Sequence, residues 1–440
     1  MEKLLQSVEN YTDVMLKAEE YIWKNPETGY KEYKTNKYMI EQFKSLGYDV
    51  IAPNDITGFY TTIDTGKPGP TVLILAELDS VICASHPSAD PITGAVHACG
   101  HHCQCSALLG IAGALKQDGV LDDLCGKIKL CAVPAEELLE IEYRTELIKK
   151  GDIKYFGGKT EFLSRGYFDD VDVAFMVHTG RGYTVLDGHI GCIAKKIVYK
   201  GKSAHAGGSP WLGKNALYAA TCGINAVNAI RETFIDSDMI RFHPIITNGG
   251  QIVNAIPETV CIESYVRGKT YDAIVKANKR VNQALIGSAL SLNNNIEILD
   301  YPGYSPEVND TGMNDLARQA IKMALDIDCY VGGTSSGSTD MGDLSVVMPT
   351  VQFFSAGATG TSHGNDYKIV DVKKATVDSA KAQCALLYLL LKDDAKKLYD
   401  IKSKYTPVYP SIKAYLDYID KIFSSGDRII YNENNVEVIL

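Results

Sequence analysis

Three short apolar runs, separated by segments with helical spacing, restrict the fold of this chain more than any other feature. The runs cover residues 71–76, 127–133 and 171–177, and runs of this length are typical of strands that are buried on both faces. A helical pattern at 106–116 lies between the first two runs, and residues 4–46 predict a helix, a turn at 25–29 and a second helix. Strands that alternate with helices predict an α/β fold with a mostly parallel sheet flanked by helices, in which chemistry sits at the carboxyl ends of the strands.

The pattern changes between residues 191 and 303. An alternating strand, a helix, two further strands, another helix and a last strand follow one another, which is the β-α-β-β-α-β order of a ferredoxin-like α+β unit. The predicted elements of its first part are 194–199, 212–232, 245–250 and 260–267. A chain of 440 residues exceeds the usual size of a single core. We therefore predict a catalytic domain formed by residues 1–190 and 304–440, with an inserted domain at 191–303.

Composition excludes several classes of partner. The chain has 44 basic and 54 acidic residues, a formal charge of -10, and no block of Lys and Arg with interleaved aromatic residues. Nucleic acid and acidic membrane surfaces are therefore not expected as partners. No run of about 18 apolar residues and no secretory signal is visible. Eleven cysteines at irregular spacing predict reduced thiols and a cytoplasmic location.

Two metal-binding side chains lie close together in the segment 97–101. Cys99 and His101 are two residues apart, immediately before a predicted helix, so both can point from one loop toward one metal ion. An equally good interpretation of the pair alone is a buried thiol beside a hydrogen-bonded histidine. Cys103 and Cys105 do not have zinc-ribbon spacing, and we expect them to pack in the core.

Further donors follow two other predicted strands. Glu136 and Glu137 end an apolar run, where adjacent carboxylates repel each other unless a cation or a shared proton offsets the repulsion. If both lay on a strand their side chains would point in opposite directions, so that one could bind metal while the other served as a base. A solvated acidic turn is the alternative. His178 also ends an apolar run, and the lone His363 lies in a glycine-rich loop.

Asp79 follows the first apolar run. It could orient a metal ligand or simply cap the following segment.

The ordered set of motifs resembles the amidohydrolase branch of the aminoacylase and carboxypeptidase G family of metallopeptidases. This branch contains auxin-conjugate amidohydrolases and aminobenzoyl-glutamate hydrolases, of which the latter group is the more similar. The matching segments span nearly the whole chain: 25–29 with Glu32; 97–101; 134–137; His178; 201–206 with 215–217; 249–258 with Arg267; 337–343; and His363. Each motif is weak alone, but the ordered set is specific. The resemblance implies a zinc-exopeptidase-like fold with an inserted dimerisation domain.

The resemblance also assigns roles to residues of this chain. It implies that two divalent metal ions, zinc, manganese or cobalt, are bound by a set of five residues with Cys99 as the bridge, and that Glu136 is the general base. It implies a homodimer formed through the inserted domain, in which His205 reaches the partner's active site. Asn254 and Arg267 match positions that bind substrate, and Arg267 suits a carboxylate. The five implied ligands are Cys99, His101, Glu137, His178 and His363.

One segment departs from the family pattern. His102 stands where the branch usually has Asp, and Cys103-Gln104-Cys105 replaces the usual Gly-His-Thr. An extra imidazole or thiol near the metals could change the choice of metal or enter the ligand set.

These observations predict a hydrolase that cleaves the amide bond of an N-acyl amino acid or a small dipeptide with a free carboxylate. One alternative is a catalytically silent dimeric binding or scaffold protein of the same fold, motivated by the altered segment 102–105. A second alternative is an enzyme with Cys99 as nucleophile or redox thiol and His101 as its partner. The role of the tail 405–440 is not predicted.

Overall fold

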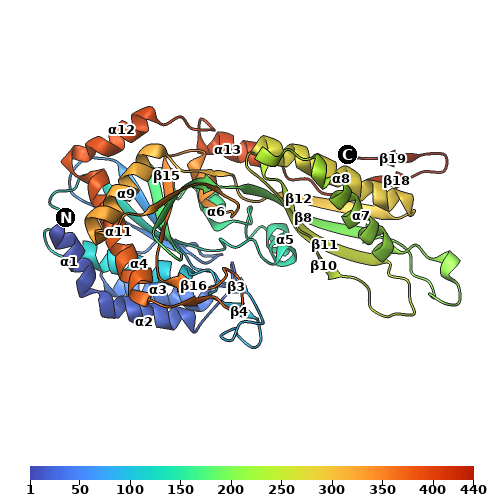
Figure 1. Ribbon diagram of the computed structural model, residues 1–440, viewed down its shortest axis with the longest axis horizontal. Coiled ribbons are helices and arrows are strands. Elements are labelled where there is room, and N and C mark those ends of the chain that lie inside the picture. Colours follow the sequence, from blue (N-terminus) through green and yellow to red (C-terminus); the bar gives the residue numbers. More distant parts are fainter.

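The predicted apolar runs are the central strands of the larger of two main sheets. The computed structural model describes all 440 residues, and Figure 1 shows this sheet in the left half of the molecule. Its core strands β5, β2, β6 and β15 run parallel, while β1 and β7 pair antiparallel at the sides. In spatial order the strands are β1 (Phe59–Asp64), β5 (Lys127–Val133), β2 (Thr71–Glu77), β6 (Val173–Thr179), β15 (Thr350–Ser355), β7 (Thr184–His189) and β13 (Glu307–Val308), with β14 (Tyr330–Ser335) also on β7. The mostly parallel sheet is confirmed.

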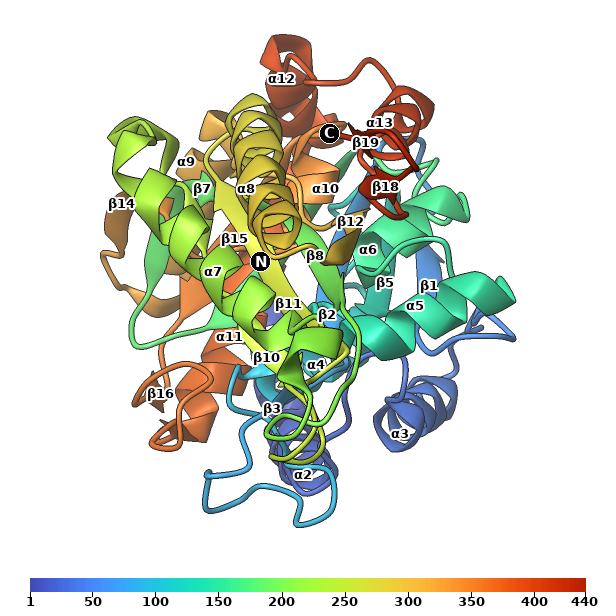
Figure 2. The same ribbon diagram turned by 90° about the vertical axis from the view of Figure 1, so that its right-hand side faces the viewer.

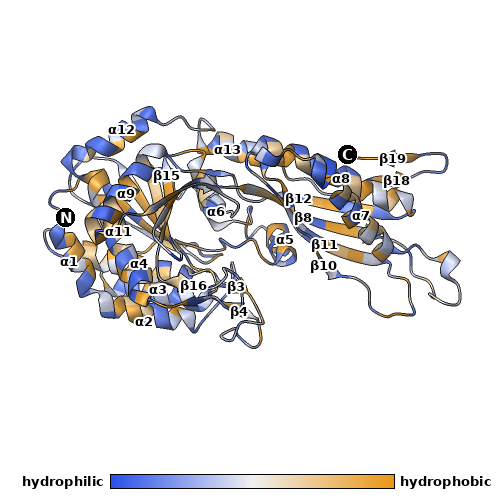
Figure 3. Cartoon of the chain, viewed as in Figure 1, coloured by the Kyte–Doolittle hydropathy of each residue, from blue (hydrophilic) through white to orange (hydrophobic).

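Both faces of this sheet are covered, as predicted. Along β2, Val72 and Ile74 face one core and Leu73 and Leu75 face another, because successive side chains of a strand point to opposite faces. The first core is closed by α1 (Glu2–Asn10), α2 (Thr12–Trp23), α3 (Tyr33–Ser45), α4 (His101–Leu115), α9 (Thr311–Leu325) and α11 (Ser379–Leu391). The second is closed by α6 (Gly158–Ser164), α10 (Met341–Ser345) and α13 (Ile412–Ile419). Figure 3 shows the strands as mostly apolar and the outer helices as two-sided.

Several predicted helix limits are wrong by a few residues. The first predicted helix is divided at Tyr11 into α1 and α2, whereas the predicted break around 25–29 is confirmed. The helix predicted over 212–232 is α7 (Ala216–Ile230), because the Asn215 side chain caps it by accepting a hydrogen bond from the Tyr218 N–H. The helix predicted from residue 106 begins five residues earlier, at His101.

The smaller sheet has the predicted ferredoxin-like order. The chain leaves the large sheet after β7 and returns to it at β13. Between them, α7 packs against α8 (Tyr271–Ser291) on an antiparallel sheet, visible in the right half of Figure 1. The strands in spatial order are β10 (Ile245–Asn248), β11 (Thr259–Gly268), β8 (Gly191–Lys200) and β12 (Asn295–Pro302), with the short β9 (Arg241–Phe242) also on β11. The limits 191 and 303 stay our proposed domain boundaries.

The C-terminal tail covers one edge of the smaller sheet. After α13 the chain runs beside β12, where the Asp300 N–H donates to the Ser424 carbonyl and the Arg428 N–H to the Ile296 carbonyl, each over 2.8 Å. It ends in a hairpin of β18 (Ile429–Tyr431) and β19 (Val436–Val438), which Figure 2 shows beside β12. The opposite edge strand, β10, has four exposed residues. The sheet therefore has one covered and one open edge.

None of the helices combines the length and the apolar character that crossing a lipid bilayer requires.

Candidate active site

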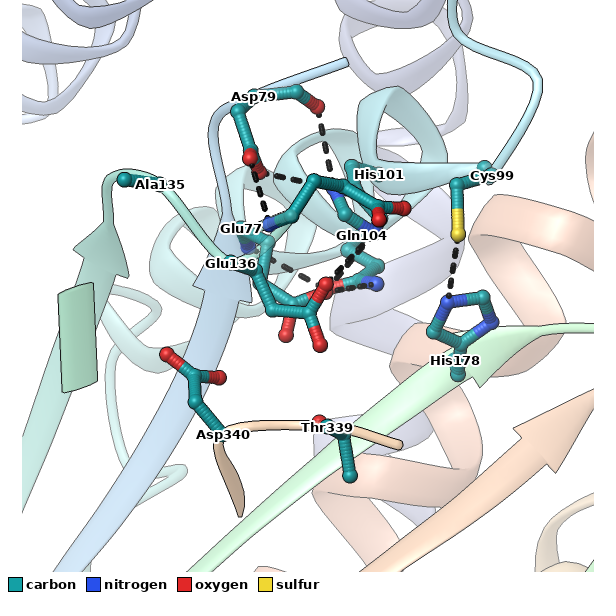
Figure 4. A network of polar contacts seen from close by, with 12 residues as sticks. Glu77, Asp79, Cys99, His101, Gln104, Ala135, Glu136, His178, Thr339 and Asp340 are labelled. Carbon is teal, nitrogen blue, oxygen red and sulfur yellow. Dashed lines mark hydrogen bonds and ion pairs between the residues drawn. The ribbon is translucent and has the colours of Figure 1, made fainter. Parts of the chain in front are cut away.

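The chemically important side chains gather where the parallel strands end. Glu77 is the last residue of β2, and His178 is the second-last residue of β6. Asp79 follows β2, and the pair Glu136 and Glu137 follows β5. Because these strands are parallel neighbours, their carboxyl ends meet at one edge of the sheet. The predicted location of the site at this edge is therefore the observed one (Figure 4).

The prediction that Glu136 and Glu137 lie on a strand is wrong. Strand β5 ends at Val133, since Pro134 has no N–H to continue the ladder and Ala135 has a left-handed backbone with φ of 53°. The two carboxylates diverge because this turn directs them, and the Glu137 N–H is held by Asp79 Oδ2 at 2.8 Å.

Helix α4 begins at the metal-binding motif itself. His101 is its first residue, and the preceding Gly100 has a φ of 90°. A Cβ atom at Gly100 would lie 2.7 Å from Tyr367 Oη and 2.9 Å from Thr179 Cβ, so only glycine fits this approach. Since His102 and Cys103 are helical, they turn away from the direction of His101.

Five predicted ligands converge in two overlapping groups. Cys99, His101 and His178 form one group and Cys99, Glu137 and His363 form the other, with the donor atoms of each group within 4.8 Å of one another. Cys99 Sγ lies 3.4 Å from His178 Nε2, and His363 Nε2 lies 3.0 Å from Glu137 Oε1. Cys99 belongs to both groups, which is the arrangement that a bridging ligand between two cations needs.

Neighbouring groups orient the two buried imidazoles. His101 Nδ1 donates to Asp79, whose carbonyl oxygen is 3.0 Å and whose Oδ1 is 3.1 Å away. His178 Nδ1 donates to the Thr179 carbonyl at 3.0 Å. In a neutral ring the Nε2 atom is thereby left without a proton, which is the tautomer that a metal ligand requires. Asp79 therefore orients His101, which was one of its two expected roles, and it also holds the Glu137 N–H.

The charges of this cluster are strongly coupled. Burial and the Glu137 charge would raise the pKa of Cys99, but His101 and His178 outweigh them and lower it to about 6. Burial would also raise the pKa of Glu137, yet His363 and His101 lower it to about 2. Glu136 behaves in the opposite way: burial, followed by Glu77 and Glu137, raises the pKa of its carboxyl well above the usual range. One carboxylate is thus ready to bind a cation while its neighbour retains affinity for a proton.

Sequence reasoning missed a buried ion-pair cluster beneath Glu136. Lys159 Nζ lies 2.5 Å from Glu77 Oε1 and also contacts Asp340, and all three side chains are inaccessible to solvent. Glu77 additionally lies 3.1 Å from His101 Nε2, in a third donor group with His101 and Glu136. Asp340 lies in the matching segment 337–343 and Glu77 directly follows the predicted strand 71–76, but no sequence signal pointed to Lys159.

A cavity of about 310 Å³ opens onto the two donor groups. Arg267, from β11 of the smaller sheet, lines it together with Glu136, His178 and His363. The cavity is therefore built by both sheets. The Arg267 Nε atom is buried and has no hydrogen-bond partner within the chain.

His205 and Asn254 are not brought to this cavity. Both are exposed on neighbouring loops beyond the smaller sheet, where the Ala206 N–H donates to the Asn254 carbonyl at 2.9 Å. His205 Nδ1 accepts from the N–H groups of Gly207 and Gly208, at 3.2 and 2.8 Å. A neutral His205 ring consequently carries its proton on Nε2, as an outward-facing donor.

The residues that depart from the family pattern stay outside both pocket groups. His102 and Cys103 form a separate group with Glu19 of α2, and the Cys105 thiol donates to the Glu77 carbonyl. None of the three lines the cavity. The expectation that they could enter the ligand set of the pocket is not met.

Comparison with known proteins settles the family. The model of peptidase family M20/M25/M40 matches residues 73–392, almost three quarters of the chain. The chain belongs to this family. The resemblance inferred from the ordered motifs is confirmed.

Two curated relatives show how this M20 family member compares with named proteins. It is 27% identical to the mouse Xaa-Arg dipeptidase over 68% of this chain and 65% of that protein, just under two thirds of the relative's length. It is 26% identical to the indole-3-acetyl-aspartic acid hydrolase of Enterobacter agglomerans, over 62% of this chain and 70% of that protein.

The fold is shared with a solved structure. A dinuclear metal-binding M20 peptidase from Bacillus subtilis matches with a TM-score of 0.63 and 19% identity, over 87% of this chain and 99% of that chain. At this identity the likeness concerns the fold.

Asp79 offers a direct test of ligand orientation in this M20 family member. Asp79→Asn removes the charge that holds His101 and the Glu137 N–H, so we expect the affinity for divalent metal to fall about 10- to 100-fold. Competition with a chromophoric chelator measures this affinity. Asp90→Asn is the control, because the Asp90 carboxylate only caps a turn. Equal affinities of wild type and Asp79→Asn would contradict the assigned role.

Proposed function

We propose that this protein is a two-metal amidohydrolase that cleaves N-acyl amino acids or small dipeptides with a free carboxylate. The observation that carries the proposal is the shared position of Cys99 in two donor groups, with Glu136 beside them. Family membership and the named activities of the two relatives support hydrolysis of an amide bond.

The donor set fits a pair of divalent ions. Imidazole, thiolate and carboxylate suit zinc, and manganese and cobalt are the other candidates. His101 Nε2 and the Cys99 sulfur are buried in a cluster where negative groups repel one another, which is the repulsion that bound cations offset. When bound, such ions acidify a water molecule and polarise the substrate carbonyl.

Glu136 is the proposed general base. Its side chain is buried but lines the cavity, and its raised pKa allows it to take a proton from water and to return it to the departing amine. Tyr304 donates a hydrogen bond to the Glu136 backbone carbonyl, so the main chain of the base is held in place.

The size of the cavity and the charge of Arg267 support the proposed substrate class. A volume of about 310 Å³ is at the lower end of the range for small-molecule sites. Arg267 presents a cation to it, and a substrate carboxylate would pair with that guanidinium. Asn254 remains a proposed substrate contact that acts across the dimer.

A homodimer through the inserted domain is the proposed assembly. The tail covers the β12 edge, so β10 is the edge of the smaller sheet that is free to pair with a second copy. Ile245 of β10 is 61% exposed, and four other large apolar side chains of the inserted segment, Trp211, Tyr218, Ile252 and Val253, are also 61 to 101% exposed. In such a dimer the outward Nε2–H of His205 would stabilise the oxyanion in the partner's site.

The eleven cysteines are all free thiols. A reducing compartment such as the cytoplasm is the location that we propose on this basis.

A thiol enzyme is the second candidate, because a Cys99 pKa of about 6 beside His178 would suit a nucleophile. Against it, Glu137 and His363 point at the same sulfur, as metal ligands would. The silent-scaffold alternative was based on the altered segment 102–105, and these residues lie outside the cavity.

Metal removal separates these candidates. We expect chelation to abolish hydrolysis of a panel of N-acyl amino acids and dipeptides, and zinc, manganese or cobalt to restore it. Thiol alkylation of the metal-loaded protein should have little effect. Full activity in the presence of chelator, with loss on alkylation, would favour the thiol enzyme instead.

Replacing the base tests the mechanism. Glu136→Gln keeps the shape of the side chain but cannot take a proton. We therefore expect kcat to fall about 10²- to 10⁴-fold while the metal content stays unchanged. Substantial remaining turnover by the metal-loaded variant would refute Glu136 as base.

Mixed dimers test the contribution of the partner subunit. Co-expression of His205→Ala chains with Glu136→Gln chains gives dimers in which one site retains its own Glu136 and the partner's His205. Random pairing should restore about a quarter of wild-type activity from two inactive parents, because half the dimers then hold one working site of two. No recovery in purified mixed dimers would show that His205 does not act across an interface.

A further inference from the structure

Helix α4 carries potential metal ligands on two sides of its first turn. His101 belongs to the donor group of Cys99 and His178, whereas His102 and Cys103 form a group with Glu19 of α2, which packs alongside α4. Each residue of a helix is rotated by about 100° from the last, so three consecutive side chains cannot share one direction. The second set of donors therefore lies behind the active site and shares no member with the groups that contain Cys99.

Three different donor types meet at this position. His102 Nε2 lies 3.3 Å from Glu19 Oε1 and 3.4 Å from Cys103 Sγ. His102 and Cys103 are fully buried, and the Glu19 side chain is 13% exposed. Nε2 has a single position for a proton, so a hydrogen bond satisfies only one of its two neighbours. A cation at their common centre would be bound by all three.

A fourth potential donor lies beside this group. The His97 ring is 5.1 Å from the His102 ring and is buried. Neither nitrogen makes a hydrogen bond of normal geometry, although a backbone group of Ile22 lies near the ring. Buried polar groups without partners are rare in proteins, and each calls for a physical reason. Trp23 of α2 also packs near His102, with the two ring centroids 5.0 Å apart.

We propose that Glu19, His102 and Cys103 bind a third metal ion, zinc, which has a structural role. Zinc bonds of about 2.0–2.3 Å at tetrahedral angles place donor atoms about 3.3–3.6 Å apart, and the two separations at His102 agree with this spacing. His97 is the candidate for the fourth donor. The ion ties α2 to the first turn of α4, and it does not touch the cavity that holds the substrate. This site is independent of the proposed hydrolytic function.

The first test is the metal content of matched variants. Glu19→Gln, Cys103→Ser and the double variant should each lose one zinc ion per chain relative to wild type, measured by mass spectrometry after dialysis. The controls are Glu20→Gln, since Glu20 pairs with Lys24 at the surface, and Cys105→Ser, whose hydroxyl can still donate to the Glu77 carbonyl. Glu19 is partly exposed, so its variant remains informative if Cys103→Ser fails to fold. Wild-type zinc content in folded Glu19→Gln and in the double variant would overturn the proposal.

A spectroscopic test distinguishes the two thiolates. In the cobalt-substituted Cys99→Ser variant, thiolate-to-cobalt charge-transfer absorption should persist, and it should disappear in Cys99→Ser/Cys103→Ser. A crystal of the zinc-loaded wild-type protein should also show an anomalous peak between Glu19, His102 and Cys103. Absence of both the residual absorption and the peak would overturn the proposal, whether or not the protein hydrolyses amides.

Discussion

The site at the carboxyl ends of the parallel strands depends on the burial of several negatively charged groups in one place. Glu77, Glu136 and Glu137 converge with the Cys99 thiolate in a region that is largely closed to water. Such a cluster is costly unless positive charge offsets it. Lys159 supplies that charge on the inner side of the cluster, where it contacts Glu77 and Asp340. On the cavity side the histidines, and metal ions when bound, have this role.

The surroundings of the site also give the adjacent residues Glu136 and Glu137 different properties. Burial, together with the neighbouring carboxylates, raises the pKa of Glu136, whereas Glu137 is turned toward His363, whose charge outweighs burial and lowers its pKa. Two identical side chains at consecutive positions thereby acquire opposite affinities for protons. The cause is the tight turn at Ala135, which directs them to different surroundings.

The smaller sheet contributes directly to the cavity. Through Arg267 it supplies a cation to the cavity of its own chain, while His205 and Asn254 lie on exposed loops outside that cavity. The C-terminal tail, for which the sequence predicted no role, covers the β12 edge and leaves β10 open. The tail thus leaves β10 as the edge of this sheet at which another strand could pair.

Periodicity and motif order determined the α/β class, the inserted β-α-β-β-α-β unit and the five side chains that converge at Cys99, because strand period and ligand chemistry are local properties. The sequence alone did not reveal that α4 begins at His101, since histidine and cysteine carry no strong helix signal. It also did not reveal the turn that separates Glu136 from Glu137, or the ion pairs of Lys159. Only the tertiary structure decided that His101 joins Cys99 and His178 while His102 and Cys103 join Glu19. That outcome depends on how α4 packs between β2 and α2, and contacts between segments about 80 residues apart leave no trace in local spacing.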